Sequence, residues 1–341
     1  MARADNPPVI VEKASRSVKH HSKEQATQLL IALDFLTANE PEQRLKLKLS
    51  IRSYEALTKK AQELYGDKRY PQLDYNRKDS TVIITTIPTA MHGVSSSGLQ
   101  QMIYESVRAT LNSHNFGDLA WRITGYGESN TEPVYEGYED SASKIPDGGF
   151  CFETDNGTVL TLVLEVGMSQ VYDDLKSDME AWLNGVHCQA VVLLYLEEHP
   201  KFGYAPSQMP LSADDWPAFR MAMTRARDRN PFGPYNYRGH QWFAKLVSAS
   251  AEVYRRHDGA DGAFSMTKYS LVEEGEQCFA SAESVDIGLF AGDLIAPDAE
   301  ASTEARSLSV AFAGRDVAVM LRTGCIMTAK RRFAHFFKES H

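Results

Sequence analysis

The sequence contains no apolar stretch near the roughly 20 consecutive residues that cross a bilayer, and its N-terminus has no apolar run of signal-peptide length. Only four of its 341 residues are cysteines, and they form no CxxC pair, which excludes the usual disulfide frameworks and zinc knuckles. The ten histidines show no HExxH or comparable ligand spacing. We therefore expect an intracellular protein, cytoplasmic or nuclear, with no membrane partner, reduced thiols and no histidine-built metal site.

A strong positive charge is also missing. The net charge of −9 and the pI of about 5.6 oppose a protein that coats nucleic acid through bulk electrostatics. The charge is unevenly spread, because residues 1–70 carry 13 Lys and Arg against 9 Asp and Glu, a net of +4, whereas the rest of the chain has a net of −13. Contacts with phosphate would therefore depend on local basic patches.

Length and composition allow a large core. With 43% hydrophobic residues, the chain is long enough for one elaborated domain or two. Residues 1–22 are polar and show little apolar periodicity, which predicts a flexible leader. Residues 23–38 and 42–65 carry leucine and other apolar residues at helical spacing, so we expect an N-terminal helical hairpin within residues 23–70. This pattern leaves three roles open: packing on the core, a homo-oligomer contact, or the binding of a protein partner.

The segment from residue 80 to residue 200 has the regular pattern of an α/β core. Its first predicted elements are a strand at 80–89, a helix with an apolar face at 97–113 and a short strand at 121–124. Past residue 200 the pattern loosens, and residues 240–256 predict a helix while residues 306–323 predict two strands. We therefore expect residues 201–341 to form an irregular α+β C-terminal extension packed on the core.

A hairpin that carries two acidic residues lies inside this core. Residues 155–157, Asp-Asn-Gly, are a strong turn signal, and residues 158–166 form the returning strand. With a three-residue turn, the register places Asp147 directly opposite Glu165, and a two-residue turn shifts the pairing by one position. Directly opposed side chains of an antiparallel pair have Cβ atoms about 4.5–5.5 Å apart.

Two carboxylates at that separation repel each other unless a proton or a cation lies between them. A hard divalent ion that takes oxygen ligands, Mg²⁺ or Mn²⁺, would remove the repulsion, so Asp147 and Glu165 are candidate metal ligands. Glu165 also interrupts an otherwise apolar run, residues 162–166, of the kind buried on both faces of a sheet. The alternative is that Glu165 marks the end of the strand and meets solvent or an arginine.

A strand, a helix and a second strand complete this region. Apolar residues recur at helical spacing over residues 172–184, and Asn184-Gly185 is a suitable end for that helix. Residues 188–197 contain a continuous apolar run that predicts a buried strand. Such a unit is expected to have a right-handed crossover.

The helix at 97–113, the hairpin with Pro146-Asp147 and Glu165, and the unit at 172–197 together resemble the core of the PD-(D/E)XK, or restriction-endonuclease-like, nuclease superfamily. The resemblance covers about 100 of the 341 residues. It implies an α/β fold whose mixed central sheet is flanked by helices. It also implies that Asp147 and Glu165 bind one or two Mg²⁺ ions and that a phosphodiester bond in DNA or RNA is hydrolysed.

The superfamily has a lysine two residues after the Glu, where it orients or activates water, but this sequence has Gly167 there. Some branches place the equivalent lysine on the following helix, which makes Lys176 a candidate, although Lys176 is also placed for ordinary helical ion pairs. Gln170 is a second polar candidate near the metal. Glu105, on the first helix, either extends the metal shell or faces solvent. His92, just before that helix, is ambiguous in the same way.

These features support two functions. The first is a metal-dependent nuclease in which Asp147 and Glu165 bind Mg²⁺ or Mn²⁺ and Lys176 or Gln170 assists. The second is a catalytically inactive nuclease-like module that binds or scaffolds, for which Gly167 is the evidence. The sequence has no P-loop, GxGxxG or GxSxG motif to support another common α/β enzyme.

Overall fold

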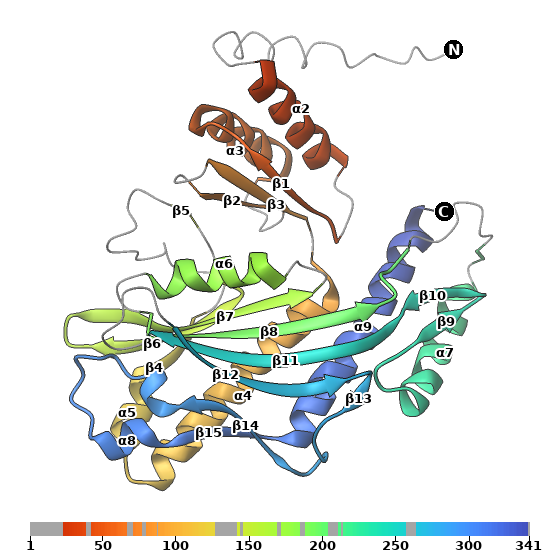
Figure 1. Cartoon of the computed structure of the whole chain (residues 1–341). Coiled ribbons are helices and arrows are strands. Elements are labelled where there is room, and N and C mark those ends of the chain that lie inside the picture. The colour runs from red at the N-terminus through yellow and green to blue at the C-terminus, as the bar shows by residue number, and fades with distance from the viewer. Residues whose placement is uncertain are drawn as a thin grey trace, which may run out of the picture. The chain divides into compact units, whose positions relative to one another are not determined.

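The computed structural model divides the chain into two compact units, whose elements Figure 1 shows. The N-terminal unit comprises Met1–Pro88 and Tyr138–Lys144, and the main unit comprises Thr89–Gly137 and Ile145–His341. The residues that the structure describes are 23–38, 42–66, 71–76, 80–86, 88–126, 142–143, 146–168, 172–184, 188–203, 211–212, 214–256 and 264–339.

The N-terminal unit is a four-stranded antiparallel sheet with two helices. Its strand order is β1-β3-β2-β5. Helices α2 and α3 pack on the sheet through an apolar core to which Leu36, Leu57 and Ile84 contribute. Its elements are α2 (Lys23–Ala38), β1 (Arg44–Lys48), α3 (Ile51–Tyr65), β2 (Gln72–Asn76), β3 (Thr81–Thr85) and β5 (Ala142–Ser143).

The predicted N-terminal helical hairpin is wrong, because a strand separates the two helices. Residues 44–48, which the prediction assigned to the second helix, form β1. Basic residues and leucine alternate along this segment, which is the two-residue period of a strand. Helix α3 begins only at Ile51, after Ser50, whose side chain accepts a hydrogen bond from the Ser53 amide.

The main unit is built on a curled, mixed sheet of seven strands, which confirms the predicted α/β class. The strand order is β13-β12-β11-β8-β7-β6-β4. Neighbouring strands are antiparallel except for the parallel pair β7 and β8. The strands are β4 (Ile123–Tyr126), β6 (Gly148–Thr154), β7 (Gly157–Met168), β8 (Ala190–His199), β11 (Lys245–Arg256), β12 (Phe264–Glu273) and β13 (Glu276–Gln277).

Helices cover both faces of this sheet (Figure 1). Helices α4 and α9 pack on one face, in a core that includes Ile103, Leu164 and Leu321. Helix α6 packs on the other face, where Val163 and Leu193 are buried beneath it. The helices of the main unit are α4 (Ala90–Ser113), α5 (Gly117–Arg122), α6 (Tyr172–Leu183), α7 (Asp215–Arg229), α8 (Thr303–Ser307) and α9 (Gly314–Glu339).

Two small antiparallel sheets, each of two strands, and one 3₁₀ turn complete the described part of the main unit. Strands β9 (Tyr235–Tyr237) and β10 (His240–Phe243) form one pair, and β14 (Ser284–Phe290) and β15 (Ser309–Ala313) form the other. The 3₁₀ turn η2 covers Ala291–Asp293. None of the helices within the described ranges is both long and apolar enough to cross a bilayer.

The hairpin of β6 and β7 has a shorter turn than predicted. Thr154 pairs with Gly157, so two residues rather than three form the loop, and Gly157 has a φ of 125° that L side chains rarely adopt. A bulge between Phe150 and Cys151 then shifts the register by one position. At the far end Gly148 pairs with Leu164, which is the register that the three-residue turn implied.

The C-terminal third departs most from the sequence prediction. Residues 240–256, predicted as a helix, form β10 and β11, and β11 lies in the middle of the sheet between β8 and β12. Residues 306–323, predicted as two strands, contain the end of α8, β15 and the start of α9. Because β11, β12 and β13 belong to the main sheet, these residues are part of the core and not an extension packed on it.

Candidate functional site

Asp147 lies directly before β6, beside the N-terminal end of α4. Its Oδ2 atom accepts a hydrogen bond of 2.8 Å from the Val166 amide and lies 3.0 Å from Nε2 of His92. Its carbonyl oxygen accepts a hydrogen bond of 2.6 Å from the Ser96 hydroxyl. The side chains of Asp147 and His92 are only 13% and 16% exposed. The carboxylate is therefore held in one orientation from two sides.

His92 takes its place from the start of α4. Thr89 caps this helix, since its hydroxyl accepts a hydrogen bond of 3.1 Å from the His92 amide. The imidazole can then reach Asp147, and a carboxylate partner fixes both the tautomer and the orientation of a histidine ring. The sequence named His92 only as an ambiguous candidate, because nothing local links residue 92 to residue 147.

Glu165 is buried beneath α6, which packs on the sheet face opposite α4. The residue is 5% exposed, and its Oε1 atom accepts a short hydrogen bond from the indole N–H of Trp182. The surrounding residues Val163, Leu175 and Leu193 are apolar. A buried carboxylate needs such donors, because taking it out of water is costly otherwise. The alternative that Glu165 meets solvent at a strand end is thus wrong.

The hairpin brings Asp147 and Glu165 to the same end of β6 and β7, but the Asp147 side chain bonds to His92 of α4 and the Glu165 side chain bonds to Trp182 of α6. Strand pairing ends at Gly148 and Leu164, so the two acidic residues stand one position beyond that pair. Asp147 bonds to groups of α4 and to the β7 backbone, whereas Glu165 bonds to α6. Across the described ranges, no three or more His, Cys, Asp or Glu side chains are grouped so that they could hold a metal ion. The predicted metal pair remains a prediction.

The other predicted site residues that the structure describes contact residues other than Asp147 and Glu165. Glu105 is exposed and bonds to Gln101, and it lies nine residues, roughly 13 Å along the helix axis, beyond Ser96, which contacts Asp147. This geometry opposes a role for Glu105 in the metal shell. Lys176 lies on α6 with its Nζ atom 5.1 Å from the centroid of the Tyr172 ring. Gln170 lies outside the described residues.

Gly167 has a packing reason that the sequence did not reveal. A Cβ atom at this position would lie 2.8 Å from Cδ2 of Leu175, which is buried under α6. A lysine at this position would therefore require the buried Leu175 side chain to move. The close approach of α6 to β7 at this point takes the space that such a side chain needs.

Replacing Gly167 by alanine is expected to lower the free energy of unfolding by about 1–3 kcal/mol, because the added methyl group overpacks the contact with Leu175. Urea denaturation measures this loss. In a double-mutant cycle with Leu175→Ala, the double variant should lose at least about 0.5 kcal/mol less than the sum of the two single losses, because the smaller alanine at position 175 makes room for the methyl group at position 167.

The matched control for that experiment is Gly203→Ala. A Cβ atom at Gly203 would meet nothing within 4 Å, and its backbone has no positive φ. Its effect should stay within about 0.5 kcal/mol. Equal effects at positions 167 and 203, or strict additivity with Leu175→Ala, would contradict the packing explanation of Gly167.

A second polar network lies on the same face of the sheet as Glu165. Along one row, Glu165 pairs with Leu193, Leu193 pairs with Glu252, and Glu252 pairs with Lys268. The Glu252 side chain is fully buried, with Lys268 Nζ 3.0 Å from its Oε1 atom. The Tyr172 hydroxyl donates to Oε2, which ties the first residue of α6 to β11.

The Tyr254 hydroxyl completes the network with a hydrogen bond of 2.9 Å to Oε2 of Glu252. Burial alone would raise the pKa of Glu252, but the hydrogen bonds from Tyr172, Lys268 and Tyr254 outweigh burial and lower it. Burial and the adjacent carboxylate raise the pKa of both tyrosines. The network therefore consists of one carboxylate that stays charged and two phenols that stay neutral. Tyr172 lies 80 residues from Glu252 in the sequence, so the sequence gives no sign of their contact.

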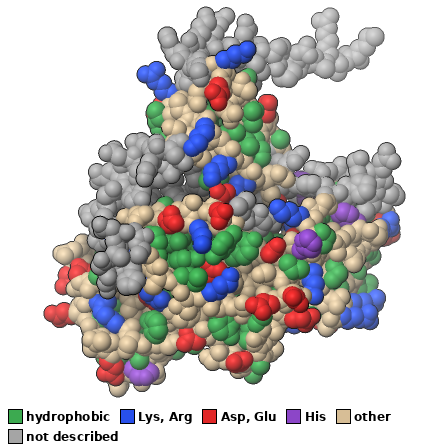
Figure 2. All heavy atoms as spheres, in the orientation of Figure 1, with side chains coloured by type: hydrophobic (Ala, Val, Ile, Leu, Met, Phe, Trp, Pro, Cys, Tyr) green, Lys and Arg blue, Asp and Glu red, His purple; other side chains and the backbone are tan. Residues whose placement is uncertain are grey.

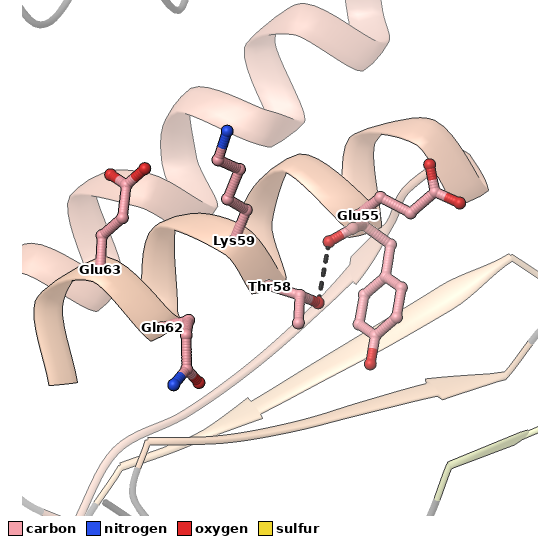
Figure 3. A pocket seen from close by; sticks show the side chains of 6 residues that line it. Glu55, Thr58, Lys59, Gln62 and Glu63 are labelled. Atoms are coloured by element: carbon pink, nitrogen blue, oxygen red, sulfur yellow. Dashed lines mark hydrogen bonds between the residues drawn. The ribbon is translucent and has the colours of Figure 1, made fainter. Parts of the chain in front are cut away.

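A separate pocket of about 660 Å³ lies along α3 in the N-terminal unit (Figure 3). It is lined by Tyr54, Glu55, Thr58, Lys59, Gln62 and Glu63. The Thr58 hydroxyl donates a hydrogen bond of 3.0 Å to the Tyr54 carbonyl, which is an ordinary contact within a helix. The lining mixes both signs of charge and pairs no nucleophile with a base, so we assign it no chemistry.

Figure 2 shows acidic and basic side chains interspersed over the described atoms of one face. The chain as a whole has a net charge of −9. The electrostatics of the whole chain therefore do not mark the candidate site, whose evidence is the local geometry of Asp147 and Glu165. No family model matches the sequence, and neither a curated protein nor a solved structure is significantly similar to it.

Proposed function

We propose that the main unit is a metal-dependent nuclease in which Asp147 and Glu165 hold Mg²⁺ or Mn²⁺ and a phosphodiester bond of DNA or RNA is hydrolysed. The observation that carries the proposal is the position of two largely buried carboxylates one residue beyond the last pair of a central hairpin. The order α4, β4, β6, β7, α6 and β8, with β7 parallel to β8, supports the resemblance to the PD-(D/E)XK core.

The side chains of Asp147 and Glu165 have the oxygen atoms that such an ion takes as ligands. Carboxylate oxygens are the ligands that hard divalent ions prefer, and each ionised carboxylate offers about four acceptor positions. The hydrogen bonds from Val166 to Asp147 and from Trp182 to Glu165 are therefore compatible with ligation, since ligating carboxylates are usually oriented by such partners. A bound divalent ion supplies Lewis acidity toward water and phosphate oxygens.

The residues of the chain have separate roles in this proposal. His92 and the Val166 amide orient Asp147, and the Trp182 indole orients Glu165. Lys176 is the basic candidate closest in sequence to the superfamily's alternative lysine position, and it lies against Tyr172 at the start of α6. The Tyr172 bond to Glu252 fixes that end of the helix above the sheet.

The experiment is a titration of Mn²⁺ and Mg²⁺ into the protein by calorimetry, beside a cleavage assay on single- and double-stranded DNA and RNA. We expect cleavage only with metal, and a loss of metal binding and at least a roughly 100-fold loss of cleavage in Asp147→Asn and Glu165→Gln. Glu105→Gln, on the exposed side of α4, is the matched control and should leave both unchanged.

A folded protein that neither binds metal nor cleaves would refute the nuclease. One observation favours the alternative of an inactive nuclease-like binding module, because Leu175 fills the space of the missing lysine at Gly167. In that case Glu165→Gln should leave nucleic-acid binding unchanged. It should also leave the free energy of unfolding unchanged or raise it, since a neutral amide costs less to bury than a carboxylate.

A further inference from the structure

Strand β1 of the N-terminal unit carries three basic residues on one side. Arg44, Lys46 and Lys48 alternate with Leu45 and Leu47, and alternate residues of a strand point to opposite faces of its sheet. The two leucines pack in the core with α2 and α3. The basic residues, which we call the basic stripe, therefore lie on the sheet face opposite the helices.

The neighbouring strand adds two threonines to this face, of which Thr85 is partly exposed and Thr81 is buried beside Lys48. The register pairs Arg44 with Thr85 and Lys48 with Thr81. The Lys48 ammonium donates a hydrogen bond of 2.8 Å to the Thr81 hydroxyl, which fixes its position above β3. Lysine, arginine and threonine side chains are frequent partners of phosphate oxygens in protein–nucleic acid contacts.

The spacing of the basic stripe suits a chain of regularly spaced anions. Alternate residues of an extended strand are roughly 6.8 Å apart, so Arg44, Lys46 and Lys48 extend over roughly 14 Å. Charges at these separations lie within about one or two Debye lengths at physiological salt and act together on a polyanion. Residues 1–70 have a net charge of +4, whereas the remainder of the chain has −13. The net charge of residues 1–70 thus favours the approach of a polyanion, whereas that of the remainder opposes it.

We propose that the basic stripe on β1 binds the phosphate backbone of a nucleic acid, the substrate of the main unit. The choice of nucleic acid as the ligand rests on the proposed function. Binding itself needs no metal ion and no cleavage. The contact is to the backbone, so it should be tolerant of sequence, and its strength should fall steeply with salt.

The test is fluorescence anisotropy with the full chain and fluorescein-labelled 20-mers, single-stranded and duplex, in EDTA between 25 and 200 mM NaCl. The variant is Arg44→Glu/Lys46→Glu/Lys48→Glu. The matched control is Arg52→Glu/Lys59→Glu/Lys60→Glu, which reverses as many charges on α3, in the helical layer. Circular dichroism and thermal unfolding establish that both variants fold.

We expect the stripe variant to bind at least about tenfold more weakly at low salt, and the slope of log K against log salt to fall by about two to three. The control should change affinity by no more than about threefold. Equal losses in both variants, no loss in the stripe variant, or no binding by the unmodified chain would overturn the inference. Competition by polyglutamate as strong as that by the oligonucleotide would identify an acidic protein as the ligand and overturn it too.

The result is separable from the nuclease proposal. Because the assay contains EDTA, Asp147→Asn should bind the oligonucleotide as the unmodified chain does. Stripe-dependent binding without cleavage would retain this inference and leave an inactive binding module. Cleavage that is independent of the stripe would retain the nuclease and refute this inference alone.

Discussion

Replacing Phe333 by alanine is expected to lower the free energy of unfolding of the main unit by about 3–5 kcal/mol. Phe333 on α9 is fully buried and stacks on Phe219 of α7 at a centroid distance of 3.9 Å. The ring of Trp242 meets it edge-on at 5.0 Å. Removing the ring leaves a cavity between three elements that cannot easily collapse, and offset or edge-on aromatic pairs add to the cost.

Urea denaturation followed by tryptophan fluorescence measures this effect. All four tryptophans belong to the main unit, so the signal reports that unit alone. Met327→Ala is the control on the same helix, because Met327 is 42% exposed and its truncation should cost about 0.5 kcal/mol or less. Similar losses at Phe333 and Met327 would contradict the packing of α9.

Replacing Arg332 by methionine should also cost about 3–5 kcal/mol, because it leaves a buried carboxylate without its counter-ion. The guanidinium of Arg332 makes two hydrogen bonds of 2.8 Å to Glu198 of β8, and both side chains are at most 4% exposed. Glu198 also accepts a hydrogen bond of 2.7 Å from the Ala244 amide. The pair joins the C-terminal helix to a central strand.

The double variant Glu198→Gln/Arg332→Met should regain at least about 2 kcal/mol over Arg332→Met, because glutamine removes the charge and keeps an acceptor for Ala244. The same unfolding experiment tests it. Arg331→Met, one residue earlier on the exposed side of α9, should cost less than about 1 kcal/mol. An additive double variant would show that Glu198 and Arg332 are not energetically coupled.

These two predictions concern a helix that the sequence pattern did not reveal. The exposed positions of α9 recur about every four residues, but they include the apolar Val319 and Met327, whereas the buried face includes Thr328 and Arg332, so polarity does not mark the two faces. Strand β11 escaped prediction for a related reason, since it is covered on both faces and shows no alternation of buried and exposed residues. Inference from periodicity depends on a difference in polarity between two faces, and neither element shows such a difference.

The segment around the hairpin could be predicted because its signals are local. The Asp-Asn-Gly turn at 155–157, the apolar strand β7 and the amphipathic helix α6 each depend on neighbours in the sequence. The alternation of Arg44–Lys48 was equally local, but the flanking helical residues obscured it. A five-residue strand offers too few periods to outweigh a long helical pattern beside it.

At the candidate site, the sequence identified the carboxylates but not their partners. The buried position of Glu165 followed from an acid within an apolar strand, whereas its donor Trp182 looked like one more apolar residue of α6. The contact of Asp147 with His92 joins residues 55 positions apart. Such pairs depend on tertiary packing, and no periodicity in a single sequence encodes them.

The bulge between Phe150 and Cys151 has a consequence for how this hairpin tolerates insertion and deletion. In a strand, parity decides which face a side chain occupies, and a slip of one residue inverts it. The loop and the bulge each contribute to that parity, so one residue gained in the loop is cancelled by the loss of the bulge. The register of Asp147 against β7 therefore depends on the loop and the bulge together. Variants of the loop can differ in length and still keep this register if the bulge changes to compensate.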